Sequence, residues 1–307
     1  MSILVTGARG FIGRALCRHL TDQGVRVCGL GHGDVPAGEL ESSGLACWRQ
    51  GEVDFANLDG LAAAQGPFSA VVHLAGGSTV GASIRAPLED FNRTCGTSVQ
   101  LLDWIRARSP HTAVLVISSA AVYGGGHSGP IREDAATSPA SPYGTHKLVM
   151  ELLCRSYVRN FGIKAAILRL FSVYGEGLKK QLLWDLCAAL ARDGSALLAG
   201  SGEEMRDWIH VSDAAELIRM VVAKASIECP IFNGGTGRCS KVAEIAAYVA
   251  GCWSSAAQVR FSGERRPGDP RCLLADPTRA TDIGFHPRIE LHTGLLRYVQ
   301  WFRETTS

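Results

Sequence analysis

The sequence lacks the patterns of a membrane protein, a secreted protein or a metal-stabilised fold. It has no stretch of roughly 18 uninterrupted apolar residues, which a membrane-spanning helix needs. Its ten cysteines include no C-x-x-C pair, and no histidine lies at zinc-ligand spacing from them. The chain also opens directly into Ile3-Leu4-Val5 without a basic, apolar leader. We therefore expect reduced, mostly buried thiols, no metal site and a cytoplasmic location.

The chain also lacks a large net charge of either sign. The 307 residues include 31 Lys and Arg against 29 Asp and Glu, which leaves a formal net charge of +2. Nucleic-acid and membrane surfaces usually select a basic excess, so we expect neither partner, and any anion site must be local. Hydrophobic residues make up 46% of the chain and charged residues 20%, so the chain can bury a large core and is not disordered.

Short β-rich runs alternate with helical patterns through the first half of the chain, which predicts stacked βαβ units and a parallel sheet. We expect a Rossmann-type, doubly wound α/β domain over residues 1–171 and a smaller substrate-binding lobe over residues 172–307. A return segment near residues 206–234 can rejoin the first domain. The predicted strands are Ile3–Thr6, Val25–Leu30, Ala70–Leu74, Ala113–Ser118 and Ile163–Leu170, and the predicted helices are Phe11–Gln23, Gln181–Arg192, Ser212–Lys224 and Lys241–Gly251.

A glycine-rich turn follows the first predicted strand. Residues 6–13 contain the pattern Gly-x-x-Gly-x-x-Gly directly before a helix. Glycines at this spacing permit a tight turn, close approach of the backbone to a pyrophosphate and close packing of helix on strand, while the helix N-terminus offers free N–H groups to phosphate. The pattern predicts a dinucleotide site. The contacts expected from this turn are Gly7, Arg9, Gly10, Phe11, Ile12 and Gly13.

The second predicted strand ends without an acidic residue. A carboxylate there would accept a hydrogen bond from a free ribose 2′-hydroxyl and would repel a 2′-phosphate. This chain instead has Gly31 and His32, which we expect beside the adenosine ribose. Arg9 can reach the same corner, and a guanidinium suits a phosphate better than a hydroxyl. The combination favours NADP(H), with NAD(H) as the alternative.

A serine, a tyrosine and a lysine predict proton-transfer chemistry. Ser119 closes a predicted strand, and Tyr143 follows 24 residues later with Lys147 four positions beyond it. Residues four apart share a helix face, so Tyr143 and Lys147 can point together into the cleft at the strand ends. A tyrosine with a pKa of about 10 is a poor base, but an ammonium and an oxidised nicotinamide both favour its phenolate. We expect Ser119 to hydrogen-bond the substrate oxygen and Lys147 also to hold the nicotinamide ribose.

Seven motifs occur in order along nearly the whole chain, and through them the sequence resembles the extended short-chain dehydrogenases/reductases of the nucleotide-sugar epimerase, dehydratase and reductase group. This resemblance implies a nucleotide-diphosphate sugar as substrate. It also implies a homodimer formed by the helices around residues 96–108 and 143–160. The motifs are Thr6–Gly13, Val72–Gly76, Ser118–Gly124, Tyr143–Lys147, Leu168–Gly175, Arg206–Val211 and Arg265–Asp269.

Further contacts are implied by the same resemblance. Leu74, Ala75 and Gly76 are expected to line the cofactor. Arg206 and Arg266 are expected to hold the diphosphate of the sugar nucleotide, and two arginines can make bidentate, charge-assisted bonds to such a group.

Two alanines narrow the expected reaction. Dehydratases of the family carry Asp-Glu directly after the catalytic Ser or Thr, and the related decarboxylases commonly keep a glutamate at the second position. This chain has Ala120 and Ala121, whose methyl groups cannot move protons. Our preferred expectation is a 4-ketoreductase of a 4-keto or 4-keto-6-deoxy nucleotide sugar, because Gly31 and Arg9 favour NADPH. The alternatives are an NAD-dependent 4-epimerase and, more remotely, a dinucleotide-binding regulator that does not need the spaced Ser119, Tyr143 and Lys147.

Overall fold

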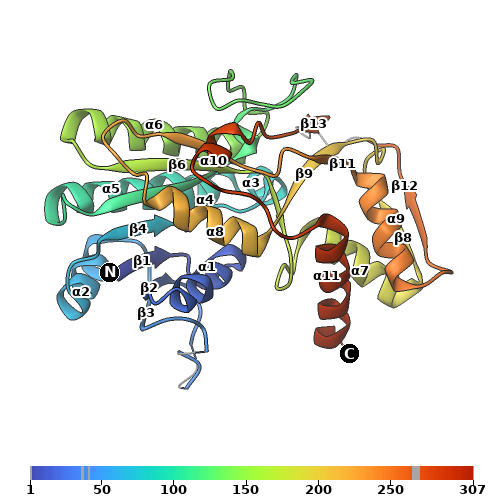
Figure 1. Cartoon of the computed structure of the whole chain (residues 1–307), viewed down its shortest axis with the longest axis horizontal. Coiled ribbons are helices and arrows are strands. Elements are labelled where there is room, and N and C mark those ends of the chain that lie inside the picture. Colours follow the sequence, from blue (N-terminus) through green and yellow to red (C-terminus); the bar gives the residue numbers. More distant parts are fainter. Residues whose placement is uncertain (1, 36–37, 41, 265–269, 307) are drawn as a thin grey trace.

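The larger part of the protein is a seven-stranded sheet in which every strand pair is parallel. The computed structural model describes residues 2–35, 38–40, 42–264 and 270–306 (Figure 1). The strand order β10-β6-β5-β4-β1-β2-β3 runs outward in both directions from β1 and β4, so the expected doubly wound fold is confirmed. The strands are β1 (Ser2–Thr6), β2 (Arg26–Gly31), β3 (Cys47–Gln50), β4 (Ala70–His73), β5 (Ala113–Ser119), β6 (Ala165–Leu170) and β10 (Ile231–Gly234).

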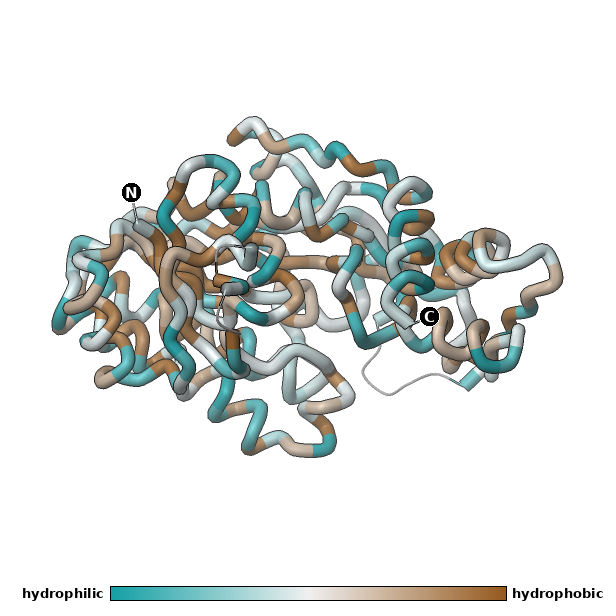
Figure 2. The backbone as a smooth tube through the Cα atoms, turned by 90° about the horizontal axis from the view of Figure 1, so that it is seen from below, coloured by the Kyte–Doolittle hydropathy of each residue, from teal (hydrophilic) through white to brown (hydrophobic). Residues whose placement is uncertain are grey.

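Helices cover both faces of this sheet because alternate strand residues point to opposite sides. Ile3 of β1 packs in one core with Leu16 of α1, whereas the next residue, Leu4, packs in a second core with Trp104 of α5. Figure 2 shows the hydrophobic residues concentrated along the strands between the helical layers. Helices α1 (Phe11–Asp22) and α8 (Val211–Val222) cover one face, and α2 (Phe55–Gln65), α5 (Thr97–Arg108) and α6 (Pro142–Phe161) cover the other.

The second half of the chain contributes to both parts of the molecule. Strand β10 pairs with β6, and α8 packs against α1, so residues 211–234 lie on the larger sheet. Strand β9, directly before them, belongs to a small sheet with β7, β11 and β13. The remaining helices and strands are α3 (Val80–Arg85) and α4 (Pro87–Phe91) in the first half, and β7 (Ser172–Tyr174), α7 (Gln181–Asp193), β8 (Ser195–Leu198), β9 (Met205–His210), β11 (Cys239–Lys241), α9 (Val242–Trp253), β12 (Gln258–Phe261), β13 (Cys272–Leu273), α10 (Thr278–Asp282) and α11 (Leu291–Thr306) in the second half.

Three helices of the smaller lobe, α7, α9 and α11, enclose a core of their own beside the sheet (Figure 1). Leu186, Ile245 and Tyr298 are fully buried or nearly so in this core. All ten cysteines are free thiols, and none is exposed. No helix in the described ranges is both long and apolar enough to cross a membrane.

Candidate active site

A cavity of about 1350 Å³ lies along the carboxyl ends of β1, β2, β4, β5 and β6. Doubly wound sheets bind their ligands at this edge. The cavity continues into the smaller lobe, where Leu198 and Arg206 form part of its wall. The sequence-predicted contacts that line it are Gly7, Arg9, Gly10, Phe11, Ile12, Gly13, Gly31, His32, Leu74, Ala75, Gly76, Ser119, Tyr143, Lys147 and Arg206. Arg266 lies outside the described residues.

The glycine turn has the close contacts that its spacing predicts. Gly7 has a φ of +71°, and its N–H donates to the carbonyl oxygen of Leu30 at 2.8 Å. A Cβ at Gly13 would lie 2.3 Å from the carbonyl oxygen of Gly7, so only glycine lets α1 pack this closely on the turn. Gly10 is the N-cap of α1 and has no side chain to cap it. The first turn of α1 has no side-chain cap and lines the cavity, so it fits a pyrophosphate group.

The corner after β2 is polar but holds charges of both signs. The side chain of Arg9 lies over the turn, since a Cβ at Gly33 would be 3.6 Å from its Nε. His32 lies 3.5 Å from the carboxylate of Glu52, which follows β3 and also lines the cavity. The sequence analysis missed Glu52, because the short strand before it, β3, has a half-exposed edge and shows little hydrophobic alternation.

The three predicted catalytic side chains meet where β5 ends and α6 begins. Ser119 is the last residue of β5. Helix α6 starts at Pro142, and the Oγ of its N-cap Ser141 accepts a hydrogen bond from the N–H of Gly144 at 3.2 Å. This start places Tyr143 and Lys147 on successive turns. The Nζ of Lys147 lies 6.0 Å from the centre of the Tyr143 ring.

Burial governs the ionisation of the tyrosine and the lysine. Lys147 donates from Nζ to the carbonyl oxygen of Ile117 at 3.0 Å, and burial lowers its pKa to about 8. Burial also raises the pKa of Tyr143, while a hydrogen bond with Ser119 lowers it and the charge of Asp90 raises it. In this structure the hydrogen bond with Ser119 is a contact that favours the phenolate. The Lys147 ammonium holds the backbone of β5.

A buried ion pair lies directly behind these groups. The carboxylate of Glu151 accepts hydrogen bonds from Nε and Nη2 of Arg169 at 2.9 and 2.7 Å. Its Oε1 also accepts a hydrogen bond from the Oγ of Ser118 at 2.5 Å. Glu151 lies one turn beyond Lys147 on α6, so this contact fixes the catalytic helix against the ends of β5 and β6.

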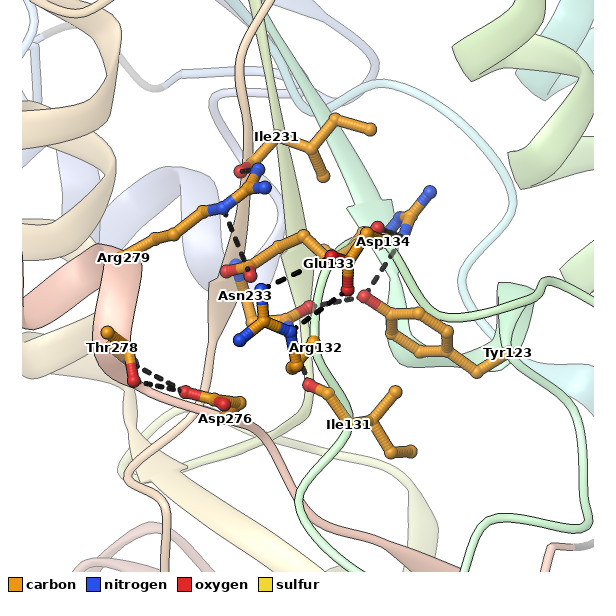
Figure 3. A network of polar contacts seen from close by, with 11 residues as sticks. Tyr123, Ile131, Arg132, Glu133, Asp134, Ile231, Asn233, Asp276, Thr278 and Arg279 are labelled. Carbon is orange, nitrogen blue, oxygen red and sulfur yellow. Dashed lines mark hydrogen bonds and ion pairs between the residues drawn. The ribbon is translucent and has the colours of Figure 1, made fainter.

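The same arginine joins a polar network that holds the segment after β5. Its Nη1 donates to the hydroxyl of Tyr123, which in turn donates to Oδ1 of Asn233 at 2.7 Å. Figure 3 shows Asn233 between Ile131 and Glu133: its Nδ2 donates to the Ile131 carbonyl oxygen at 2.7 Å, and its N–H donates to Glu133 at 2.9 Å. Residues 131–133 are thereby fixed to β10 in the larger sheet, while residues 124, 140 and 141 of the same segment line the cavity.

The lobe side of the cavity carries cations and one strained residue. Arg206 lies on β9, and the carboxylate of the neighbouring Asp207 is fully buried and accepts four hydrogen bonds from residues 236, 237 and 275. Lys180 lines the same wall, and burial lowers its pKa. Gln181, also in the wall, has a φ of +67°. Such a backbone at a non-glycine residue is typical of ligand-binding regions.

The chain is similar over nearly its full length to nucleotide-sugar epimerases. The UDP-glucose 4-epimerase of Azospirillum brasilense is 31% identical over 316 residues, covering 96% of this chain and 90% of that protein. The UDP-glucuronic acid 4-epimerase of Bacillus cereus, solved with UDP-glucuronic acid and NAD, is 28% identical with a TM-score of 0.87, covering 99% of this chain and 100% of the other. The UDP-glucose 4-epimerase of Thermotoga maritima, solved with UDP-glucose, is 26% identical with a TM-score of 0.86 and full coverage of both chains.

A family profile gives the same result. The profile of the NAD dependent epimerase/dehydratase family matches residues 3–235, which include the glycine turn, the serine of β5 and the tyrosine and lysine of α6. The resemblance found in the motifs of the sequence is thus confirmed. The protein is an enzyme of the extended short-chain dehydrogenase/reductase class and belongs to the NAD dependent epimerase/dehydratase family.

Proposed function

We propose that this enzyme is an NAD-dependent 4-epimerase of a nucleotide-diphosphate sugar. The observation that carries the proposal is the convergence of Ser119, Tyr143 and Lys147 on a cavity that has the glycine turn along one wall and Arg206 along another. Ala120 and Ala121 line the same cavity and supply no acid or base for eliminating water. The relatives named above are 4-epimerases, so the alternative of the sequence analysis replaces the ketoreductase as the preferred function.

The residues present fit a nicotinamide dinucleotide. The uncapped first turn of α1 would hold its pyrophosphate. Lys147 lines the cavity together with Ala75 and Gly76, and it would hold the nicotinamide ribose. When bound, the oxidised nicotinamide supplies an acceptor for the hydride of C4 and a positive charge that favours the Tyr143 phenolate.

The proton steps fall to two side chains. Tyr143 takes the proton from the C4 hydroxyl and returns it after the keto sugar has turned its other face. Ser119 hydrogen-bonds the same oxygen and also lowers the pKa of the tyrosine. Arg206 and Lys180 supply positive charge for the diphosphate, with Arg266 as a further proposed contact.

One observation favours a second candidate, a 4-ketoreductase that consumes NADPH. The Arg9 side chain lies over the turn after β2, and Gly31 stands where a carboxylate would repel a 2′-phosphate. The two candidates differ in the fate of the cofactor. An epimerase returns the hydride to its substrate, whereas a reductase releases oxidised cofactor at every turnover.

The deciding experiment compares two incubations of purified enzyme. In the first, UDP-hexoses are supplied without added cofactor or with catalytic NAD. In the second, a 4-keto nucleotide sugar is supplied with NADPH. We expect interconversion of the C4 epimers in the first incubation with no net change in cofactor. Stoichiometric loss of NADPH in the second incubation, without interconversion in the first, would overturn the epimerase and establish the reductase.

We also propose a homodimer that buries the outer faces of α5 and α6. Leu152 and Phe161 of α6 are 57% and 52% exposed, and Val99 of α5 is 36% exposed, so both helices present apolar side chains that a partner subunit could cover. Size-exclusion chromatography with light scattering tests this proposal. A wild-type monomer at micromolar concentration, or a dimer that persists after Leu152→Glu and Phe161→Glu, would contradict it.

A further inference from the structure

A buried carboxylate and an imidazole lie directly behind the catalytic side chains. Asp90 lies on α4 (Pro87–Phe91), and its Oδ2 is 2.6 Å from Nδ1 of His146. His146 directly precedes Lys147 on α6, so the pair joins α4 to the turn of α6 that carries the site. The Asp90 side chain is 4% exposed and the His146 side chain 13%. At this depth, solvent and salt screen the carboxylate far less than at the surface.

Two glycines bring the carboxylate close to the wall of the cavity. A Cβ at Gly77 would lie 1.9 Å from Oδ1 of Asp90, and a Cβ at Gly76 would lie 3.4 Å from Nζ of Lys147. Both glycines line the cavity. Carboxylate and ammonium therefore approach the same dipeptide of the wall. A side chain at Gly77 would have to displace the Asp90 carboxylate.

We propose that Asp90 is a positioning residue, held in place by His146, whose negative charge keeps Lys147 protonated and keeps Tyr143 neutral until an oxidised cofactor is bound. This inference rests on the proposed function, since it assigns the field that acts on the proposed proton-transfer groups. Asp90 lines no part of the described cavity and acts only through the two side chains.

The electrostatic influences on Lys147 support this role. Burial lowers the pKa of Lys147 to about 8, and Asp90 opposes this more than Cys95 and Glu151 do. His73 of β4 is a further titratable neighbour of Lys147. It is fully buried with hydrogen bonds to Thr6 and Ser98, and burial lowers its pKa to about 3. His73 is therefore neutral near pH 7 and supplies no competing charge.

The same carboxylate acts on Tyr143. Burial raises the pKa of the phenol, the Asp90 charge raises it further, and the hydrogen bond with Ser119 lowers it. With these influences, Tyr143 is mainly a neutral phenol when no cofactor is bound. The positive charge of an oxidised nicotinamide then has the largest effect on the proton of Tyr143, so proton removal is tied to the cofactor state that can accept a hydride.

The decisive variant is Asp90→Asn, which keeps the size of the side chain and an oxygen that can accept from His146. We measure the phenolate absorbance of Tyr143 against pH in the presence of saturating NAD, and subtract the matching titration of Tyr143→Phe in each background. Loss of the Asp90 charge should move the Tyr143 midpoint to lower pH by about one unit, the lower end of the effect of one close charge. Both limbs of the pH–rate profile should move in the same direction.

Two further variants separate charge from packing. Glu89→Gln removes a carboxylate from the same helix, but that side chain is 57% exposed and pairs with Arg93, so the midpoint should not change. His146→Asn keeps a neutral donor beside the Asp90 carboxylate, so the midpoint should stay at the wild-type pH or rise. If Asp90→Asn fails to fold, the Asp90→Ser variant, which removes the same charge, is titrated in its place.

An unchanged or higher midpoint in the variant without the carboxylate would overturn the inference. A fall of equal size in His146→Asn would also overturn it, because the shift would then come from disturbed packing. The titration requires no turnover. An enzyme that shows the expected shift but converts no nucleotide sugar would refute the proposed function and leave this assignment standing.

Discussion

Replacing Glu151 by alanine removes the partner of a buried guanidinium. Arg169 and Glu151 are 4% and 2% exposed, and two hydrogen bonds of 2.7 and 2.9 Å join them. Breaking a buried pair in this way typically costs about 3–5 kcal/mol, because one charge stays buried without compensation. Arg169 keeps the hydroxyl of Tyr123 and the carbonyl oxygen of Glu133 as acceptors, which places the expected loss near the lower end, at about 3 kcal/mol.

Denaturant unfolding, followed by circular dichroism, measures this loss in the free energy of unfolding. Asp193→Ala is the matched control, because its pair with Arg192 has side chains that are 49% and 73% exposed, and solvent screens such a pair so that it contributes little to stability. The double variant Glu151→Met, Arg169→Met should recover much of the lost stability, since apolar groups replace both charges. A loss below about 1 kcal/mol in Glu151→Ala, or a double variant no more stable than that single variant, would refute the reasoning.

Three further predictions concern activity and binding. Tyr143→Phe should lose about 10²–10⁴-fold in kcat while NAD affinity, measured by fluorescence titration, is retained; wild-type turnover would contradict its role as proton carrier. Arg206→Ala should raise KM for the nucleotide sugar and leave kcat nearly unchanged, because a diphosphate is held alike in ground and transition states; an unchanged KM for every accepted substrate would remove Arg206 from the diphosphate site. Arg9→Ala should weaken NADPH binding more than NADH binding, about 10-fold or more for a lost charge-assisted hydrogen bond; equal effects in calorimetric titrations would show that Arg9 does not contact the 2′-phosphate.

Local sequence patterns predict the part of the site that depends on short-range geometry. The glycine turn needs only a strand, three glycines and a helix in immediate succession, so its position follows from residues 3–23 alone. Helix α1 ends at Asp22 and Gly24 has a φ of +74°, as expected of a glycine after a helix. Tyr143 and Lys147 likewise share a helix face by spacing alone.

The same local patterns cannot predict contacts between residues that are far apart in the sequence. Strand β3 has only four residues and a half-exposed edge, so it shows little hydrophobic alternation. Asp90 and His146 are separated by 56 positions, and only the packing of α4 on α6 brings them together. The influence of Asp90 on Tyr143 depends on that packing and on burial depth. Residue spacing in the sequence predicts neither this packing nor the burial depth.

The backbone of Gly31 limits how cofactor preference could change, in evolution or by redesign. Its φ is +156°, in a region that L side chains rarely adopt, although a Cβ would meet its nearest atoms only at 3.5 Å. An aspartate at this position would fit the space but strain the chain. A new carboxylate for the ribose 2′-hydroxyl is therefore better introduced at His32, whose side chain is 74% exposed next to Glu52. The accessible mutational route to a different dinucleotide passes through the residue after the strand, not through its last residue.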